Sequence, residues 1–264
     1  MGKIFYKMCE YSRKKNWSQA CHVVVFFIQS IYMAESSVET SRLEMLKQNR
    51  EKHWHYYGAP IKDYQRDFNS VLDGEAIYNF VSSRPSPVVV DLMAPSGTLV
   101  DLFHRLPKEK TRFGLAVSLE DLRTLEKRNT DKALGIEQIA GNLFSVATWS
   151  KIDEKLAGRK ADLIMERALA ASDDFPMDKR FFSFVLRKIW RMLSEKNGMI
   201  LVQVPKIFVL CNSLGDGVTM ERWTRQLHGN GIGASYRLTV SDGYLKLVKK
   251  PHSPKELPLP SKKT

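Results

Sequence analysis

The sequence predicts an α/β fold, with a mostly parallel sheet that is flanked by helices and ends in an antiparallel hairpin. Three observations lead to this prediction. Residues 87–97 read PVVVDLMAPSG, an apolar run closed by turn residues, which is typical of a strand buried on both faces. Further short apolar runs then alternate with helical patterns, as in right-handed crossovers between parallel strands. Near the end of the chain, Asp242 and Gly243 form a strong hairpin signal between two β-like segments.

Helices are expected before the first strand. The chain has a helical pattern from Ser37, and Pro60 opens a second helix. Apolar side chains recur in that second helix at spacings of mainly three and four residues as far as Val81, which predicts one amphipathic helix. Residues 82–87 contain two prolines and lead into the first strand.

The elements after the first strand can be placed from the same patterns. Further strands are predicted at residues 112–117, 135–140, 161–165, 199–204, 234–240 and 244–249. Helices are predicted at 119–128 and 219–228, and a long one with Phe181, Phe184, Val185, Met192 and Leu193 on its apolar face. Asn197 and Gly198 end that long helix, which is the usual place for a left-handed cap.

Composition and charge limit the possible functions. The chain has 264 residues, with 43% hydrophobic and 27% charged residues, which are ordinary values for a globular protein. Its net charge is +12, but most of the excess lies in residues 1–15 and 246–264. Charged ends favour solubility and weak, non-specific attraction, so RNA stays open as a partner without being the preferred one. The three cysteines are widely spaced, which predicts no disulfide framework and favours the reducing cytoplasm.

The first part of the chain allows several interpretations. A basic stretch precedes the apolar residues 20–34, which are too short and too interrupted for a stable membrane span. They could be an organelle-targeting or signal segment, a buried helix, or sequence before a true start at Met33. We favour an accessory or non-native extension. The predicted organisation is an extension over 1–36, a helical cap over 37–86, a sheet domain over 87–250 and a disordered basic tail over 251–264.

Residues 71–248 resemble the class I S-adenosylmethionine-dependent methyltransferases. The stretch VVVDLMAPSGTL is similar to the family's first strand, acid and glycine-rich turn, and GLAVSLEDL is similar to its second strand. IEQIAGNLF resembles the third strand with the adenine-side loop, and ADLIMERAL the fourth strand. The closest similarity is LRKIWRMLSEKNGMILVQVP, the helix, turn and fifth strand. The resemblance implies a Rossmann-like methyltransferase sheet, S-adenosylmethionine as cofactor and a site at the carboxyl ends of the strands.

The resemblance also implies the cofactor-binding residues. Of the family's three glycines in the first turn only Gly97 is kept, because Met93 and Pro95 stand at the other two positions. Ala116 stands where the second strand normally carries an acid, and Glu120 lies nearby. The expected cofactor contacts are Asp91, Met93, Ser96, Gly97, Ala116, Val117, Gly141, Asn142 and Leu143. For Asp91 a purely bracing role, in which it accepts backbone N–H bonds in the turn, stays open.

Candidate catalytic residues are Glu166, His53 and His55. Glu166 follows the fourth strand, where the family places residues near the transferred methyl group, although Glu166 and Arg167 could be an ordinary ion pair. His53 and His55 lie in an aromatic segment that could cover the cofactor or simply pack on the domain, and their spacing supplies too few ligands for a metal site. Because the residues after the fourth strand, MERALAA, lack an aromatic-proline motif, a small-molecule acceptor is favoured. The alternative is a non-catalytic binding or scaffold protein, and the oligomeric state stays open.

Overall fold

A computed structural model describes residues 60–121, 123–143, 145–167, 179–205, 219–238 and 242–259. The chain divides into two compact units, Met1–Trp54 and His55–Thr264, and all of the described residues belong to the second. The expectations for 1–36 and for the helix from Ser37 therefore lie outside the described residues. In the described part of the chain, no helix is both long enough and apolar enough to cross a bilayer.

The strands form one seven-stranded sheet in the order β3-β2-β1-β4-β5-β7-β6. Their bounds are Val88–Leu92 (β1), Phe113–Ser118 (β2), Ile136–Ala140 (β3), Leu163–Glu166 (β4), Gly198–Pro205 (β5), Gly233–Leu238 (β6) and Asp242–Lys249 (β7). The first five strands are parallel to their neighbours, whereas β7 is antiparallel to both β5 and β6. The predicted fold class is confirmed: a Rossmann-like methyltransferase sheet with a terminal antiparallel hairpin.

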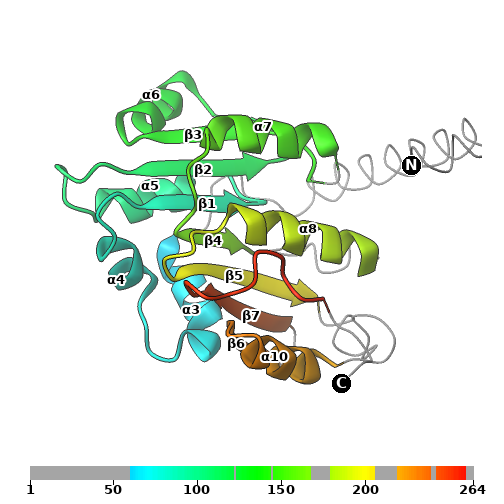
Figure 1. Ribbon diagram of the computed structural model, residues 1–264. Coiled ribbons are helices and arrows are strands. Elements are labelled where there is room, and N and C mark those ends of the chain that lie inside the picture. Colours follow the sequence, from blue (N-terminus) through cyan, green and yellow to red (C-terminus); the bar gives the residue numbers. More distant parts are fainter. Residues whose placement is uncertain are drawn as a thin grey trace, which may run out of the picture. The chain divides into compact units, whose positions relative to one another are not determined.

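Helices cover both faces of the sheet (Figure 1). Their bounds are Ile61–Leu72 (α3), Ile77–Ser82 (α4), Gly97–His104 (α5), Leu125–Ala133 (α6), Val146–Leu156 (α7), Lys179–Met192 (α8) and Met220–Gly229 (α10). Side chains of α7, α8 and α10 form one apolar core with the sheet, and side chains of α3, α4 and α5 form a second core on the other face. Successive strand residues point to opposite faces, which is why β1 supplies Val90 to the first core and Val89 to the second.

Three helix predictions differ from the structure. The long helix α8 ends at Met192 rather than at Asn197 and Gly198, and the left-handed Asn197 (φ 59°) lies in the turn before β5. The pattern from Pro60 to Val81 is two helices, because Asp73 and Gly74 take left-handed backbone conformations (φ 53° and 81°) that end α3. An Asp-Gly pair is a turn signal. The apolar spacing continues across this pair, and for that reason it predicted one helix. The helix predicted at 119–128 begins only at Leu125, because the hydroxyl of Thr124 caps it by accepting from the N–H of Lys127.

The described part of the predicted disordered tail is packed against the domain. Leu257 is buried, and the indole N–H groups of Trp190 and Trp223 donate to the carbonyls of Pro254 (3.0 Å) and Pro258 (2.8 Å). The prediction of disorder therefore fails for residues 251–259. A high proline content lowers the entropic cost of fixing a segment in one conformation. Composition alone therefore does not distinguish an ordered proline-rich segment from a disordered one.

Candidate functional site

The turn between β1 and α5 keeps a left-handed residue although it lacks two glycines. Met93 has a φ of 66°, a conformation that costs a non-glycine residue energy. The next residue, Ala94, donates its backbone N–H to the carbonyl of Val117 in β2 (3.0 Å), which fixes the turn on the sheet edge. Ser96 is buried and precedes Gly97, the first residue of α5. The sequence-predicted contacts Met93, Ser96 and Gly97 thus lie together at the carboxyl end of β1.

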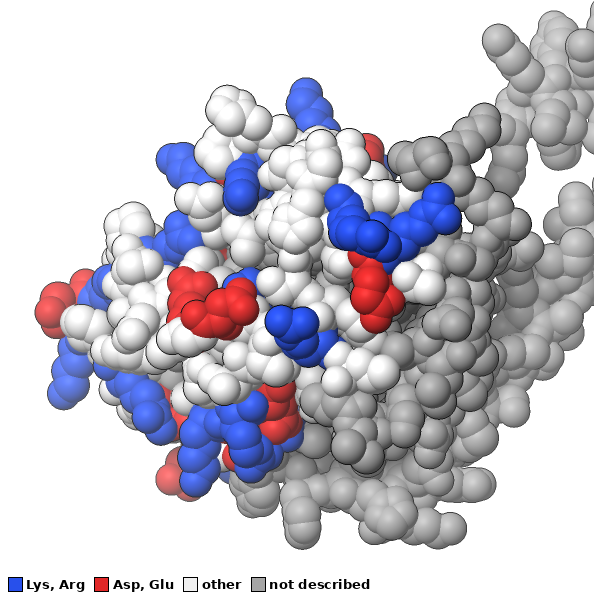
Figure 2. All heavy atoms as spheres, turned by 90° about the horizontal axis from the view of Figure 1, so that it is seen from below, with Lys and Arg blue, Asp and Glu red and all other residues white. Residues whose placement is uncertain are grey.

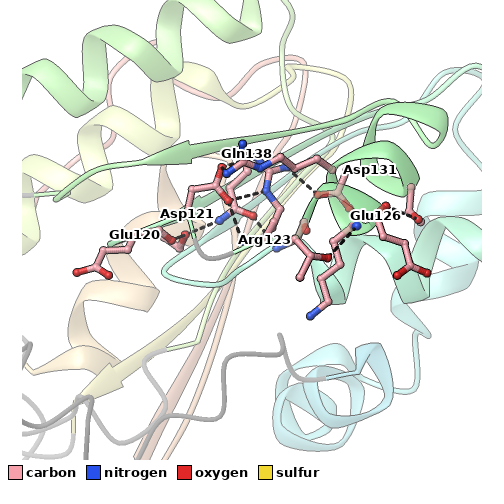
Figure 3. A network of polar contacts seen from close by, with 12 residues as sticks. Glu120, Asp121, Arg123, Glu126, Asp131 and Gln138 are labelled. Carbon is pink, nitrogen blue, oxygen red and sulfur yellow. Dashed lines mark hydrogen bonds and ion pairs between the residues drawn. The ribbon is translucent and has the colours of Figure 1, made fainter.

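A glutamine joins this turn to the end of β2. The side-chain carbonyl of Gln138 in β3 accepts the backbone N–H of Ser96 (3.2 Å), and its amide N–H donates to the hydroxyl of Ser118 (2.6 Å). The Ser118 hydroxyl in turn donates to the backbone carbonyl of Glu120 (2.7 Å). Figure 3 shows these contacts, with the Glu120 side chain directed away from the arginine of the adjoining ion pairs. Nothing in the sequence pattern singled out Gln138.

The adjoining ion pairs hold the loop after β2. Arg123 pairs with Asp121 (2.8 Å) and with Asp131 of α6 (2.8 Å), as Figure 3 shows. Hydrogen bonds from Arg123 lower the pKa of Asp121 to about 2, so its carboxylate stays charged at neutral pH. These ion pairs hold residues 121 and 123 in a loop that is tied to α6. The helix that was predicted from residue 119 therefore begins only at Leu125.

The remaining predicted cofactor contacts lie in β2 and in the segment after β3. Ala116 and Val117 of β2 are fully buried, and Ala116 belongs to the core under α3 and α5. A β-carbon on Gly141 would lie 2.6 Å from the hydroxyl oxygen of Thr148 in α7, so this glycine allows a close approach between β3 and α7. Leu143 is buried and accepts the indole N–H of Trp149 through its carbonyl (2.7 Å), and the carbonyl of Asn142 accepts the N–H of Ser145.

Two buried carboxyl groups lie at the carboxyl ends of the central strands. Asp91 of β1 and Glu166 of β4 are 0% and 3% exposed. Burial raises the pKa of Asp91 to about 8 against the hydrogen bonds from Tyr64 and Thr98 and the charge of Arg167. Burial and the negative charge of Asp91 raise the pKa of Glu166 to about 8, opposed by the backbone N–H of Gln203. Perturbed carboxyl groups of this kind are characteristic of functional sites.

Helix α3 covers Asp91 and Arg167 on one face of the sheet. The Tyr64 hydroxyl donates to the Asp91 carboxyl group, at 3.1 and 3.2 Å from its two oxygens. Asp67, one turn further along α3, accepts from Nε (2.6 Å) and Nη2 (2.5 Å) of Arg167. The guanidinium carbon also lies 5.3 Å from the centre of the Tyr64 ring. Arg167 is therefore paired with Asp67 of α3, and the ion pair with Glu166 that the sequence suggested is absent from the described contacts.

Unpartnered polar atoms gather at the same place. In the described residues, five buried side-chain nitrogen or oxygen atoms have no hydrogen-bond partner. Three of these five are Glu166 Oε1, Arg167 Nη1 and Gln203 Oε1, which lie at the ends of β4 and β5. Native structures rarely leave such atoms unpaired, so the cluster needs an explanation beyond packing. Sequence reasoning found Glu166 but missed Gln203, because the long-range register that brings the two strands together carries no local signal.

The two histidine candidates are not part of the described site. His53 and His55 lie outside the described residues. Among the residues that are described, no cluster of three or more His, Cys, Asp or Glu side chains could hold a metal ion. The residues that the structure does bring together are Asp91, Glu166 and Arg167 from the sheet and Tyr64 and Asp67 from α3.

Comparisons with known proteins find similar solved structures only at low sequence identity. No protein-family model and no curated protein matches the sequence. Among solved structures, an O-methyltransferase family protein from Burkholderia thailandensis is 17% identical over 71% of this chain, with a TM-score of 0.41. The match spans only 56% of that protein's own length. An O-methyltransferase from Bacillus cereus, solved with S-adenosylhomocysteine, is 15% identical over 80% of this chain and 91% of its own, with a TM-score of 0.48.

A third similar structure is the O-methyltransferase TomG from Streptomyces achromogenes, solved with S-adenosylmethionine. It is 14% identical over 70% of this chain and 86% of its own, with a TM-score of 0.45. Identities and TM-scores this low carry no argument about activity, and the fold is established by the sheet topology itself. In its strand order and its terminal hairpin, the chain has the Rossmann-like fold of the class I S-adenosylmethionine-dependent methyltransferases.

Proposed function

We propose that the protein is an S-adenosylmethionine-dependent methyltransferase that acts on a small molecule. One observation carries this proposal: the buried carboxyl groups of Asp91 and Glu166 lie at the carboxyl ends of adjacent parallel strands, beside a turn with a left-handed residue. In open α/β sheets this edge is where ligands bind. The unpartnered Oε1 of Glu166 adds a polar atom that a ligand could satisfy.

The residues at the turn fit the proposed cofactor in part. The left-handed φ of Met93 preserves the backbone conformation that a glycine would provide at this position. Residues that would hold the cofactor are Ser96 and Gly97 in the turn and Asn142 and Leu143 after β3. When bound, S-adenosylmethionine supplies an electrophilic methyl group on a sulfonium centre. Asp91 contributes indirectly, because its carboxyl group is held by Tyr64 and braces the end of β1.

Glu166 is the proposed general base. A neutral oxygen or nitrogen nucleophile must lose a proton as it gains the methyl group, and Glu166 would take that proton. Its pKa of about 8 makes it a stronger base than an ordinary carboxylate, close to the pH at which the protein would work. General-base catalysis of this kind contributes on the order of 10²–10⁴ in rate.

The distribution of charge favours a small acceptor over RNA. On the face shown in Figure 2, lysine and arginine side chains have acidic side chains among them, so that face presents no continuous basic surface. A polynucleotide backbone is bound mainly through such a surface. Arg167, whose charge acts on the Asp91 carboxyl group, is already paired with Asp67.

Calorimetric titration with S-adenosylhomocysteine tests the proposal. We expect binding in the micromolar range, lost when a side chain is added at the turn by Gly97→Val. The matched control is Gly229→Val at the end of α10, where a β-carbon meets nothing within 4 Å. Circular dichroism of both variants checks that they are folded.

The result also separates the two candidate functions. If the unsubstituted protein gives no heat at millimolar S-adenosylhomocysteine, the enzyme proposal fails and the fold serves as a binding or scaffold module. The proposed cofactor site is also wrong if Gly97→Val binds as well as the parent, because the ligand would then lie elsewhere.

A further inference from the structure

The unpartnered atoms at the ends of β4 and β5 lie on neighbouring residues. Glu166 pairs with Val202 in the parallel register, so the residues that follow them, Arg167 and Gln203, lie side by side at the sheet edge. The backbone N–H of Gln203 also hydrogen-bonds to the Glu166 carboxyl group. The orphan atoms of Arg167 and Gln203 therefore lie on neighbouring residues, whereas the Glu166 side chain is on the face of Leu92 and Val202, which belong to the other core.

Arg167 and Gln203 both face α3. The Arg167 guanidinium lies over the ring of Tyr64, a residue of that helix. Gln203 is opposite Tyr244 in the antiparallel pair of β5 with β7, and opposite residues share a face of the sheet. The Tyr244 ring contacts Phe68 of α3 edge-on, with ring centres 5.3 Å apart. The two residues are 6% and 8% exposed, so both are almost fully buried.

The chemistry of the two orphan atoms, Arg167 Nη1 and Gln203 Oε1, restricts which group could bind between them. Asp67 accepts from Nε and Nη2 of Arg167, and Nη1 has no hydrogen-bond partner. Like every guanidinium nitrogen, Nη1 can only donate. Gln203 Oε1 is an acceptor only. A single group that satisfies both must accept one hydrogen bond and donate another. A carboxylate would confront the oxygen of Gln203, and an ammonium group would confront the Arg167 guanidinium.

We propose that the ends of β4 and β5 form a subsite for a hydroxyl group, that of an alcohol or phenol, which accepts from Arg167 Nη1 and donates to Gln203 Oε1. In treating this hydroxyl compound as the methyl acceptor, the proposal rests on the proposed function. The subsite itself does not require the cofactor.

Fluorine NMR titrations of the full-length protein test the subsite with four probes. These are 4-fluorophenol, fluorobenzene, 4-fluorobenzoate and 4-fluorobenzylammonium, each with and without saturating S-adenosylhomocysteine. We expect 4-fluorophenol to bind on the order of ten times more tightly than each of the others, because it alone makes both hydrogen bonds. Equal affinity for fluorobenzene, or tighter binding of the benzoate, overturns the proposal, as does failure of the phenol to bind.

Two substitutions assign the contact to the named residues. Gln203→Leu keeps the side-chain size and removes the acceptor, so 4-fluorophenol should bind about five times more weakly. Arg167→Lys keeps the charge and removes the Nη1 donor, and it serves if Gln203→Leu does not fold. The control is Tyr236→Phe, which removes a buried unpartnered oxygen from β6 and should leave phenol binding unchanged. Unchanged affinity in a folded Gln203→Leu or Arg167→Lys protein contradicts the assignment.

The titrations with and without S-adenosylhomocysteine distinguish failure of the subsite from failure of the proposed function. Phenol-selective binding in a protein that does not bind S-adenosylhomocysteine supports the subsite and rejects the methyltransferase function. Binding of S-adenosylhomocysteine without any preference for the phenol supports the function and rejects the hydroxyl subsite. In that case the orphan atoms of Arg167 and Gln203 are bridged by water.

Discussion

The turn after β1 requires a left-handed backbone conformation at Met93, which is unfavourable for a residue with a β-carbon. Its φ of 66° costs a residue with a β-carbon about 1–2 kcal/mol, whereas glycine takes this conformation freely. We therefore predict that Met93→Gly is more stable than Met93→Ala by about 1 kcal/mol in urea unfolding. The two variants lose the same packing contacts beyond the β-carbon, so their difference isolates the backbone conformation.

The control for this comparison is Asn129, an exposed residue within α6. In a helix the order is reversed, and Asn129→Ala should be more stable than Asn129→Gly by about 1 kcal/mol. If alanine is preferred at both positions, Met93 does not hold a left-handed conformation in solution.

Glu166 should give methyl transfer a distinctive pH dependence. Burial and the charge of Asp91 raise its pKa to about 8, and the N–H of Gln203 opposes the shift. Only the ionised form accepts a proton, so we expect the rate to rise with pH up to about 8 and then to level off. Glu166→Gln should lower the rate on the order of 100-fold and abolish this rise of the rate with pH. A pH profile that Glu166→Gln leaves unchanged in shape would assign the base to another residue.

Asp91 should affect stability in the opposite sense to an ordinary ion-paired carboxylate. Its folded-state pKa of about 8 lies above the unfolded value of about 4, so its contribution is fully present below pH 4 and is lost as the pH rises through 8. Asp91→Asn, which cannot ionise, should therefore weaken the fall in unfolding free energy between about pH 5 and about pH 8. Urea unfolding at both pH values measures the effect, and an identical fall in parent and variant contradicts a buried, protonated Asp91.

At the scale of elements, the segment after β7 stabilises two helices. The carbonyls of Pro254 and Pro258 accept the indole N–H groups of Trp190 in α8 and Trp223 in α10, and Leu257 is 3% exposed. A chain that ends at residue 250 loses both hydrogen bonds and uncovers both indoles. We predict that it unfolds more easily by about 2–5 kcal/mol, from two hydrogen bonds and one buried leucine, and that its tryptophan emission shifts to longer wavelength.

A chain that ends at Leu259 is the control, since it keeps all of the described contacts of this segment. Its unfolding midpoint and emission should match those of the full chain. If ending the chain at residue 250 changes neither property, the segment does not contribute to the packing of α8 and α10.

At the scale of the whole molecule, local signals account for the sheet but not for the site. Every described strand lies within two residues of its predicted position, because runs such as VVVDL carry their own evidence. The predicted hairpin is present, but Asp242 and Gly243 are the first residues of β7 rather than its turn. Glu166 could be found in the same way, as the residue that ends a buried strand. The pairing of Tyr64 with Asp91, and of Asp67 with Arg167 100 residues away, depends on how α3 packs, which no local pattern encodes.

The packing of α3 and α4 determines where the folding unit begins. The sequence placed a domain boundary at residue 87, but eight side chains of these helices belong to the same core as Val89, Leu99 and Leu201. They are Ile61, Tyr64, Phe68, Val71, Leu72, Ile77, Phe80 and Val81. Burial of each contributes about 1.5–3 kcal/mol, so together they are as large as the roughly 5–15 kcal/mol by which a domain is stable.

We therefore predict that a chain of residues 87–264 does not fold, whereas a chain of residues 55–264, which is one compact unit, unfolds cooperatively. Chemical denaturation followed by circular dichroism distinguishes the two, with the full chain as reference. A cooperative transition in the 87–264 chain would show that α3 and α4 are accessory. In that case the cover that Tyr64 places over Asp91 could open without loss of the sheet, and Asp91 would become accessible to a ligand.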